Sequence, residues 1–270
     1  MRVALAQMFC RWGAVEENLT RMQQFAEEAC GGGAGAIFFP ELTITGIYKD
    51  DRVLGLAEDL EGPQVREALS ISRRTGLWLG FGLTERSSPL PYNAYCIGRP
   101  DGRLAGVYRK NCIPRLEVPW WQGDSRCPVF DVAGKRTAVA ICWDTTQPEL
   151  LAEYGARGAE IVVMPHAWDA DPLAADGTDL PHDTMAELYE HEACGRLAGW
   201  RTHDEMRDQF YRYIPQRARE NGYWALFVNQ SGQPHRAVRI EGPTFAVNPN
   251  GEIVSETRDG SEQMVWVEVG

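Results

Sequence analysis

Three side chains suited to nucleophilic chemistry follow short apolar runs of the sequence. Glu41 comes after IFFP, Lys110 after AGVYR and Cys142 after TAVAI. Because α/β folds place functional groups where strands end, we expect these residues to converge although they lie far apart along the chain. Together they supply a base, a cation and a thiol nucleophile, the set that thiol-dependent hydrolysis of a C–N bond needs.

Each of the three residues also has a simpler interpretation. A cysteine at a buried strand end is usually an inert packing residue. A glutamate after Phe-Phe-Pro is often a loop or cap residue, and a lysine in YRKN is most often a solvated surface charge. Only the combination of Glu41, Lys110 and Cys142 therefore predicts a site.

Apolar runs bounded by turn residues must position these side chains. Several runs are apolar on both faces, as expected for strands buried between two layers. Helical patterns lie between some of them, and Pro100-Asp101-Gly102 predicts a hairpin that joins 94–98 to 104–109. The alternation predicts a layered α/β domain. The other expected strands are 3–8, 36–39, 77–83, 137–142, 161–165, 225–229, 244–248 and 264–269, and the expected helices are 16–30, 62–76, 149–158 and 209–222.

We expect one domain over residues 1–270, because the chain contains neither a repeat nor a low-complexity linker. Residues from about 170 to 206 differ from the rest, being polar, acidic and rich in histidine. So long a stretch is uncommon as a plain connection. We interpret it as an insertion that acts as a lid or an oligomer contact. Its histidines and Cys194 match no standard zinc spacing, and we predict no metal site there.

Charge and composition restrict the partners and the compartment. The net charge of −11 argues against nucleic acid or an anionic membrane as the main partner. No apolar run approaches the ~20 residues that span a bilayer, and the first residues do not resemble a secretion signal. An odd count of seven cysteines without a regular framework favours reduced thiols in a cytoplasmic protein.

The residues around the three side chains resemble a known family. FFPELTITG (38–46), GRLAGVYRKNCIP (102–114) and AVAICWDTTQPEL (138–150) resemble, in this order, the glutamate, lysine and cysteine motifs of the nitrilase superfamily of carbon–nitrogen hydrolases. The likeness covers nearly the whole chain apart from the 170–206 region. It implies a four-layer α-β-β-α sandwich, a catalytic Glu41-Lys110-Cys142 triad without a cofactor, and a homodimer or larger homo-oligomer. Further matching stretches are 62–76, 91–102, 164–168, 217–232 and 242–254.

The segment LEVPWWQGD (116–124) matches a further family feature. Many members carry a second glutamate a few residues after the lysine, followed by an aromatic pair. The resemblance assigns this role to Glu117, with Trp120 and Trp121 as the pair, although the segment before Gly123 is one residue shorter than usual.

The resemblance implies a mechanism in which Glu41 accepts the thiol proton, protonates the leaving amine and then activates water. Lys110 and the backbone N–H of Trp143 are the expected donors to the oxyanion. Glu117 orients Lys110 or the substrate amide.

Several residues near the motifs bear on the substrate. Members that act on N-carbamoyl-D-amino acids carry arginines after the cysteine, where this chain has Thr145 and Thr146, which argues against a bidentate carboxylate clamp. Ile47 stands where many members have tyrosine, and Tyr48 follows it. Aromatic walls suit a substrate with an apolar or planar part, although some of the tryptophans are expected in the core. The candidate substrate-binding residues are Trp143, Tyr48, Trp120, Trp121, His166 and Trp168.

We expect a thiol hydrolase that cleaves a small linear amide or carbamoyl compound through an acyl-Cys142 intermediate. Asp144 occupies the place where nitrile-cleaving members usually have glutamate, and the chain is short, so amide hydrolysis is favoured over nitrile hydrolysis. Transfer of the acyl group to an amine stays open. A non-hydrolytic partner subunit also stays open, although the intact Glu41, Lys110 and Cys142 argue against it.

Overall fold

The computed structural model describes residues 1–270 except 49–50, 116, 169–202, 236–237 and 258. Its first strand shows how the sequence pattern builds the layers. In β1 (Arg2–Gln7), Val3 and Leu5 belong to a core cluster shared with the second sheet, whereas Ala4 and Ala6 pack with the helices on the other face. Successive strand residues point to opposite faces, so a continuous apolar run fills two interfaces at once.

The first sheet has six strands and mixed directions. Strands β1, β2 and β3 run parallel, while the hairpins β3–β4 and β4–β5 are antiparallel. Consequently β2, β3 and β5 all end at the same edge of the sheet. In spatial order the strands are β14 (Gln263–Glu268), β1, β2 (Ala36–Phe38), β3 (Trp78–Glu85), β4 (Tyr92–Gly98) and β5 (Leu104–Arg109).

The second sheet also has six strands, and its central three, β7, β8 and β9, are parallel. A separate two-stranded ribbon, β10 (Ser231–His235) with β11 (Val238–Glu241), follows β9. In spatial order the strands of the second sheet are β13 (Ile253–Glu256), β12 (Phe245–Val247), β9 (Trp224–Asn229), β8 (Ile161–His166), β7 (Lys135–Val139) and β6 (Phe130–Val132).

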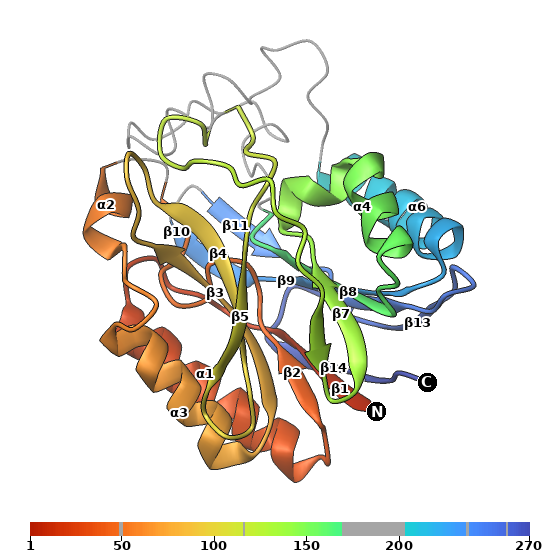
Figure 1. Ribbon diagram of the computed structural model, residues 1–270, viewed down its shortest axis with the longest axis horizontal. Coiled ribbons are helices and arrows are strands. Elements are labelled where there is room, and N and C mark those ends of the chain that lie inside the picture. The colour runs from red at the N-terminus through yellow and green to blue at the C-terminus, as the bar shows by residue number, and fades with distance from the viewer. Residues whose placement is uncertain (49–50, 116, 169–202, 236–237, 258) are drawn as a thin grey trace.

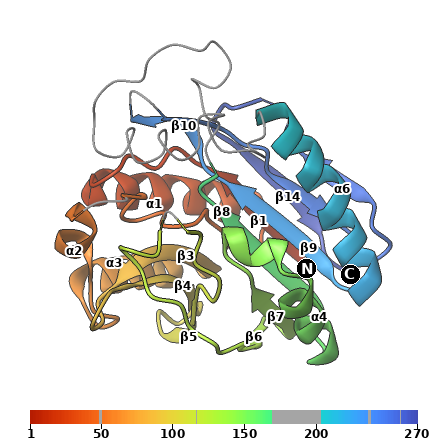
Figure 2. The ribbon, with the colours of Figure 1, turned by 90° about the horizontal axis from the view of Figure 1, so that it is seen from above.

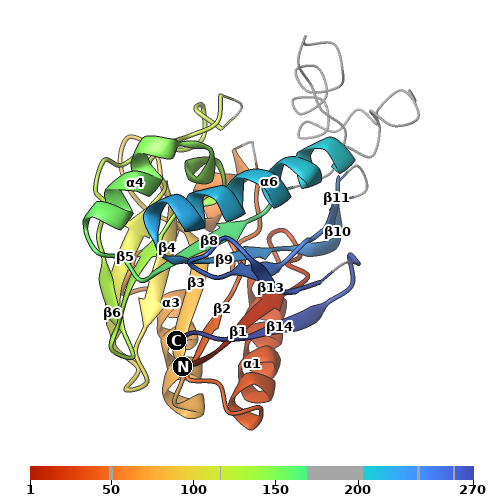
Figure 3. The same ribbon diagram turned by 90° about the vertical axis from the view of Figure 1, so that its right-hand side faces the viewer.

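Two pairs of helices cover the outer faces (Figures 1 and 2). Helices α1 (Val15–Gly31) and α3 (Pro63–Thr75) pack on the first sheet. Helices α4 (Pro148–Ala156) and α6 (His203–Asn221) lie side by side over the second (Figure 3). The predicted four-layer α-β-β-α sandwich is therefore confirmed.

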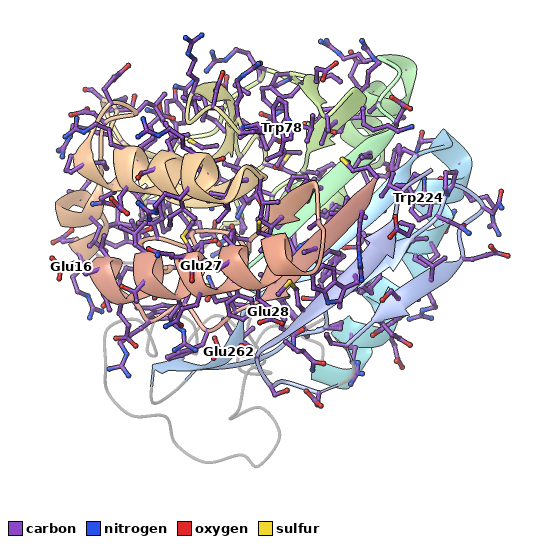
Figure 4. All side chains as sticks on the ribbon, turned by 90° about the horizontal axis from the view of Figure 1, so that it is seen from below. Glu16, Glu27, Glu28, Trp78, Trp224 and Glu262 are labelled. Atoms are coloured by element: carbon purple, nitrogen blue, oxygen red, sulfur yellow. The ribbon has the colours of Figure 1, made fainter. Side chains whose placement is uncertain are left out.

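The view from below shows the end of the sheets at which the parallel strands begin (Figure 4). Trp78 and Trp224 are the first residues of β3 and β9. Glu16, Glu27 and Glu28 lie along the exposed side of α1. The residues that the sequence marks for chemistry follow the opposite, carboxyl ends of the strands.

The structure departs from the predicted elements where the sequence is short of apolar residues. It adds α2 (Arg52–Leu56), β6, β13 and the ribbon β10–β11, none of which has a long apolar run. The strand expected over 137–142 ends at Val139, because the chain turns at Cys142.

Most of the 170–206 insertion lies outside the described residues, as do His182, His191 and Cys194. Within the described part of the chain, no helix is long and apolar enough to cross a membrane.

Candidate active site

Glu41 is held at the carboxyl end of β2 by a tightly packed backbone. Leu42, which follows it, has a left-handed φ of 48°, a conformation that non-glycine residues rarely adopt. A Cβ on Gly82 of β3 would lie 2.3 Å from the Leu42 nitrogen, so only glycine allows this approach. The Gln230 side chain donates a hydrogen bond to the Glu41 carbonyl oxygen at 2.8 Å. Backbone strain secured by several contacts is typical of functional sites.

The Glu41 carboxylate is only 1% exposed and receives three hydrogen bonds. Its Oε1 accepts from Lys110 Nζ at 2.9 Å and from Asn93 Nδ2 at 2.7 Å. Its Oε2 accepts the backbone N–H of Ala167 at 2.8 Å. These donors come from the first and the second sheet, so the carboxylate joins the ends of both.

Lys110 follows β5 and is completely buried. Its Nζ contacts two carboxylates, Glu41 Oε1 and Glu117 Oε2, each at 2.9 Å. Burial lowers the pKa of Lys110, but Glu117, Glu41 and Cys142 raise it, and the net pKa lies well above the usual 10.5. A buried lysine that is paired in this way keeps its charge.

Cys142 begins a short 3₁₀ turn, Cys142–Thr146, with a left-handed φ of 47°. Its side chain is half-buried, and its proximity raises the pKa of both Lys110 and Tyr213, so the thiol lies near both residues. The first N–H groups of a helical turn have no partner inside the turn. The Trp143 N–H therefore makes no hydrogen bond inside the turn. The first hydrogen bond of the turn runs from the Asp144 N–H to the Ile141 oxygen.

A neutral network supports the cysteine turn from the second sheet. Thr145 is buried, and its hydroxyl donates to the Cys142 carbonyl oxygen at 2.6 Å. The Thr145 hydroxyl oxygen also lies 3.1 Å from the Tyr213 hydroxyl of α6 and 3.4 Å from His166 Nε2. Burial lowers the pKa of His166 to about 3, with Lys110 acting in the same direction. His166 is therefore neutral at physiological pH, with its Nδ1 at 2.9 Å from the Met164 oxygen.

Three of the candidate aromatic residues share one apolar cluster. Trp121 is 1% exposed and packs in a cluster that includes Leu42 and Ala167, against which Tyr48 and Trp120 also pack. No acceptor among the described residues binds the Trp121 indole N–H. The cluster thus lies next to Glu41, because its member Leu42 directly follows Glu41 in the sequence.

The remaining candidates lie elsewhere around the turn. The Trp143 side chain is 44% exposed directly after Cys142. Trp168 is half-buried, with its ring 5.3 Å from the Phe210 ring and its backbone N–H bound to Asn229 Oδ1 at 3.1 Å. His166 has no exposed surface and stacks on Phe227 at 3.9 Å. The structure thus brings Tyr48, Trp120 and Trp121 together in one cluster and places His166 and Trp168 against the Phe210 ring.

Sequence reasoning did not single out Asn93, Gln230 or Tyr213. The first two contact Glu41, from 52 and 189 residues away along the chain. A signal existed for these two, since Asn93 directly precedes the apolar run AYCIG and Gln230 directly follows ALFVN. Among the residues that the structure describes, no group of three or more His, Cys, Asp or Glu side chains is placed to hold a metal ion.

Comparisons with known proteins identify the family. An (R)-stereoselective amidase from Pseudomonas sp is 24% identical over 270 residues, covering 100% of this chain and 85% of the relative. A nitrilase from Pyrococcus abyssi is 29% identical over 185 residues, covering 65% of this chain and 70% of the relative. N-carbamoylputrescine amidase from Arabidopsis thaliana is 25% identical over 263 residues, covering 93% and 80%.

Among solved structures, an amidase from Nesterenkonia sp. matches with a TM-score of 0.79 and 21% identity, covering 99% of this chain and 89% of that one. A variant of the amidase from Nesterenkonia sp. AN1 matches with the same TM-score at 20% identity, covering 99% of this chain and 89% of that one. In that structure the acetamide moiety of fluoroacetamide is covalently added at the active site cysteine. The family model described as carbon-nitrogen hydrolase matches residues 2–270. The chain therefore belongs to the carbon-nitrogen hydrolase family of the nitrilase superfamily.

Proposed function

We propose that the chain hydrolyses the C–N bond of a small linear amide through an acyl thioester on Cys142. The observation that carries this proposal is the buried ion cluster of Glu41, Lys110 and Glu117 beside a half-buried thiol. Desolvated charges that are paired with one another and lie next to a nucleophile are expected at functional sites.

The first half-reaction forms the thioester. The Lys110 cation favours the thiolate of Cys142, and Glu41 takes the thiol proton. The sulfur attacks the amide carbon, and Lys110 and the Trp143 N–H donate to the resulting oxyanion. The C–N bond then breaks, and Glu41 returns the proton to the leaving ammonia or amine.

The second half-reaction regenerates the enzyme. Glu41 removes a proton from a water molecule, which attacks the thioester carbon; the C–S bond breaks to give the carboxylic acid and the Cys142 thiolate, and Glu41 returns the proton to the sulfur. Glu117 Oε2 accepts a hydrogen bond from Lys110 Nζ at 2.9 Å, so we assign it the role of orienting the cation. No step requires a cofactor.

Two features support an amide substrate without an acidic group beside the reacting bond. Thr145 is buried against Tyr213 and His166, and Thr145 and Thr146 stand where related carbamoylases carry the arginines that bind a substrate carboxylate. The covalent adduct in the Nesterenkonia amidase supports an attacking cysteine in this fold.

By the resemblance, we also propose that the chain forms a homodimer or larger homo-oligomer. Light scattering after size-exclusion chromatography measures the mass of the assembly.

The test is ammonia release from a matched series in which propionamide, ethylurea and propionitrile present the same ethyl group. We expect the wild-type protein to release ammonia fastest from the amide. Cys142→Ala should be inactive, because it removes the nucleophile and little volume. Cys127→Ala is the matched control, since Cys127 is another half-buried free thiol. Wild-type turnover in Cys142→Ala would refute the mechanism, and release from the nitrile alone would reassign the substrate.

A further inference from the structure

Asp144 binds two segments of the proposed site at once. It is completely buried and lies two residues after Cys142. Its Oδ1 accepts the backbone N–H groups of Asn111 at 3.2 Å and Cys112 at 2.7 Å. Its Oδ2 accepts the Ile141 N–H at 2.9 Å and the Tyr108 hydroxyl at 2.7 Å.

The four donors flank the residues to which we assign the chemistry. Asn111 follows Lys110 directly, and Ile141 precedes Cys142 directly. One rigid carboxylate therefore fixes the peptide next to the cation and the peptide next to the thiol. Because the first belongs to the end of β5 and the second to the end of β7, the carboxylate also ties the first sheet to the second.

A purely structural role would be to cap the 3₁₀ turn. The Ile141 N–H alone would serve that purpose, since it lies at the start of the turn. The two N–H groups after Lys110 are outside the turn, and their binding costs the desolvation of a charge that burial disfavours. The geometry thus exceeds what a cap requires.

We propose that Asp144 is a positioning residue that sets the separation and orientation of Lys110 relative to Cys142. This inference rests on the proposed function for its effect on turnover, but its effect on the thiol does not depend on the substrate. Misplacing a reacting group by about 1 Å can reduce the rate by ~10²-fold. The consequence is a loss of kcat with little change in KM, together with a less reactive Cys142.

The experiment compares Asp144→Asn with Glu85→Gln. Asparagine keeps the shape but turns one acceptor oxygen into an NH₂ group, which cannot accept the Ile141 N–H or one of the loop amides. Glu85 is the matched control, because it is another buried acid, at the end of β3, whose carboxylate binds Arg109 of β5 at 2.6 Å. Thiol reactivity is measured by iodoacetamide labelling between pH 6 and 9. Mass spectrometry of the tryptic peptide 137–157 reads this out, because Cys142 is its only cysteine.

We expect Asp144→Asn to lower kcat by ~30- to 100-fold with KM within about threefold, and to move the labelling profile of Cys142 to higher pH. Glu85→Gln should retain kcat and the wild-type profile. Tyr108→Phe removes a single donor and should lower kcat by about five- to tenfold. If Asp144→Asn does not fold, Tyr108→Phe still tests the positioning role of Asp144.

A wild-type labelling profile and a kcat within twofold of wild type in the folded variants would overturn the proposal, even if their melting temperatures fall. If the wild-type protein hydrolyses no amide, the labelling profile still tests Asp144. Failure of the proposed function and failure of the positioning role are therefore distinguishable.

Discussion

The two sheets contribute unlike halves to the proposed site. The ends of β2 and β5, in the first sheet, supply the charged cluster of Glu41 and Lys110, which Glu117 completes. The ends of β7 and β8, in the second sheet, supply Cys142 and the neutral network of Thr145 and His166. The nucleophile is thus attached to the uncharged half and lies near Lys110 of the charged half.

The difference shows how charge is kept in place during a reaction. The pKa of Lys110 is raised well above its usual value, and the pKa of His166 is lowered to about 3. Lys110 therefore stays cationic and His166 stays neutral over the physiological pH range. In our account, the protons that move during turnover are those of the thiol and of Glu41, because the groups on either side do not titrate.

Substitutions in the charged half should cause the largest loss of kcat. Glu41→Gln preserves volume but removes the base, and Lys110→Met removes the cation while leaving two carboxylates unpaired. We expect each to lower kcat by ~10³-fold or more, because a general base contributes ~10²–10⁴-fold and an oxyanion donor ~10²–10³-fold. Steady-state kinetics on the preferred amide measures both losses. A variant that kept one tenth of wild-type kcat would contradict the assigned role.

In the neutral half, His166 should make the free energy of unfolding depend on pH. The unfolded chain protonates His166 near pH 6.5, whereas the folded chain does so only near pH 3. Acidification therefore favours unfolding, and we expect a loss of about 2 kcal/mol between pH 7 and 5 from this residue. Burial raises the pKa of Asp144 to about 6, which acts in the opposite direction.

Comparison of urea denaturation of the wild-type protein with that of His166→Gln isolates the histidine contribution, since Asp144 is common to both. The difference in unfolding free energy should shrink as the pH falls from 7 to 5 and should be constant above pH 7.5. A difference independent of pH would show that His166 is not buried in the neutral form.

The smallest expected effect concerns the hydroxyl that holds the cysteine turn. Thr145→Val removes the donor to the Cys142 carbonyl oxygen and keeps the shape, and we expect kcat to fall about fivefold. Thr145→Ser is the matched control, because it retains the hydroxyl. If serine and valine have the same kcat, the hydrogen bond is irrelevant to turnover.

The same contrast explains what the sequence predicts and what it does not. Strands with continuous apolar runs are predictable because they fill two interfaces, and strand ends then place Glu41, Lys110 and Cys142 at one edge. The ribbon SGQPH–VRIE is not predictable, since it has little apolar periodicity and contains Pro234.

Partners such as Asn93 and Gln230 escape sequence reasoning for a different reason. Each follows or precedes an apolar run and can be placed at a strand end. Its contact with Glu41 depends on the strand order of the first sheet for Asn93 and on the stacking of the two sheets for Gln230, which no local pattern encodes. Thr145 shows the same limit, because its position in the motif gives no sign that its side chain turns inward to Tyr213.

The central claim is that Cys142 carries the acyl group during turnover. Rapid acid quench of the wild-type protein with propionamide, followed by mass spectrometry of peptide 137–157, tests it directly. We predict a mass increase equal to a propionyl group in place of the thiol hydrogen, absent from Cys142→Ala. Ammonia release without any modification of this peptide, or with the acyl group on another cysteine, would contradict the account.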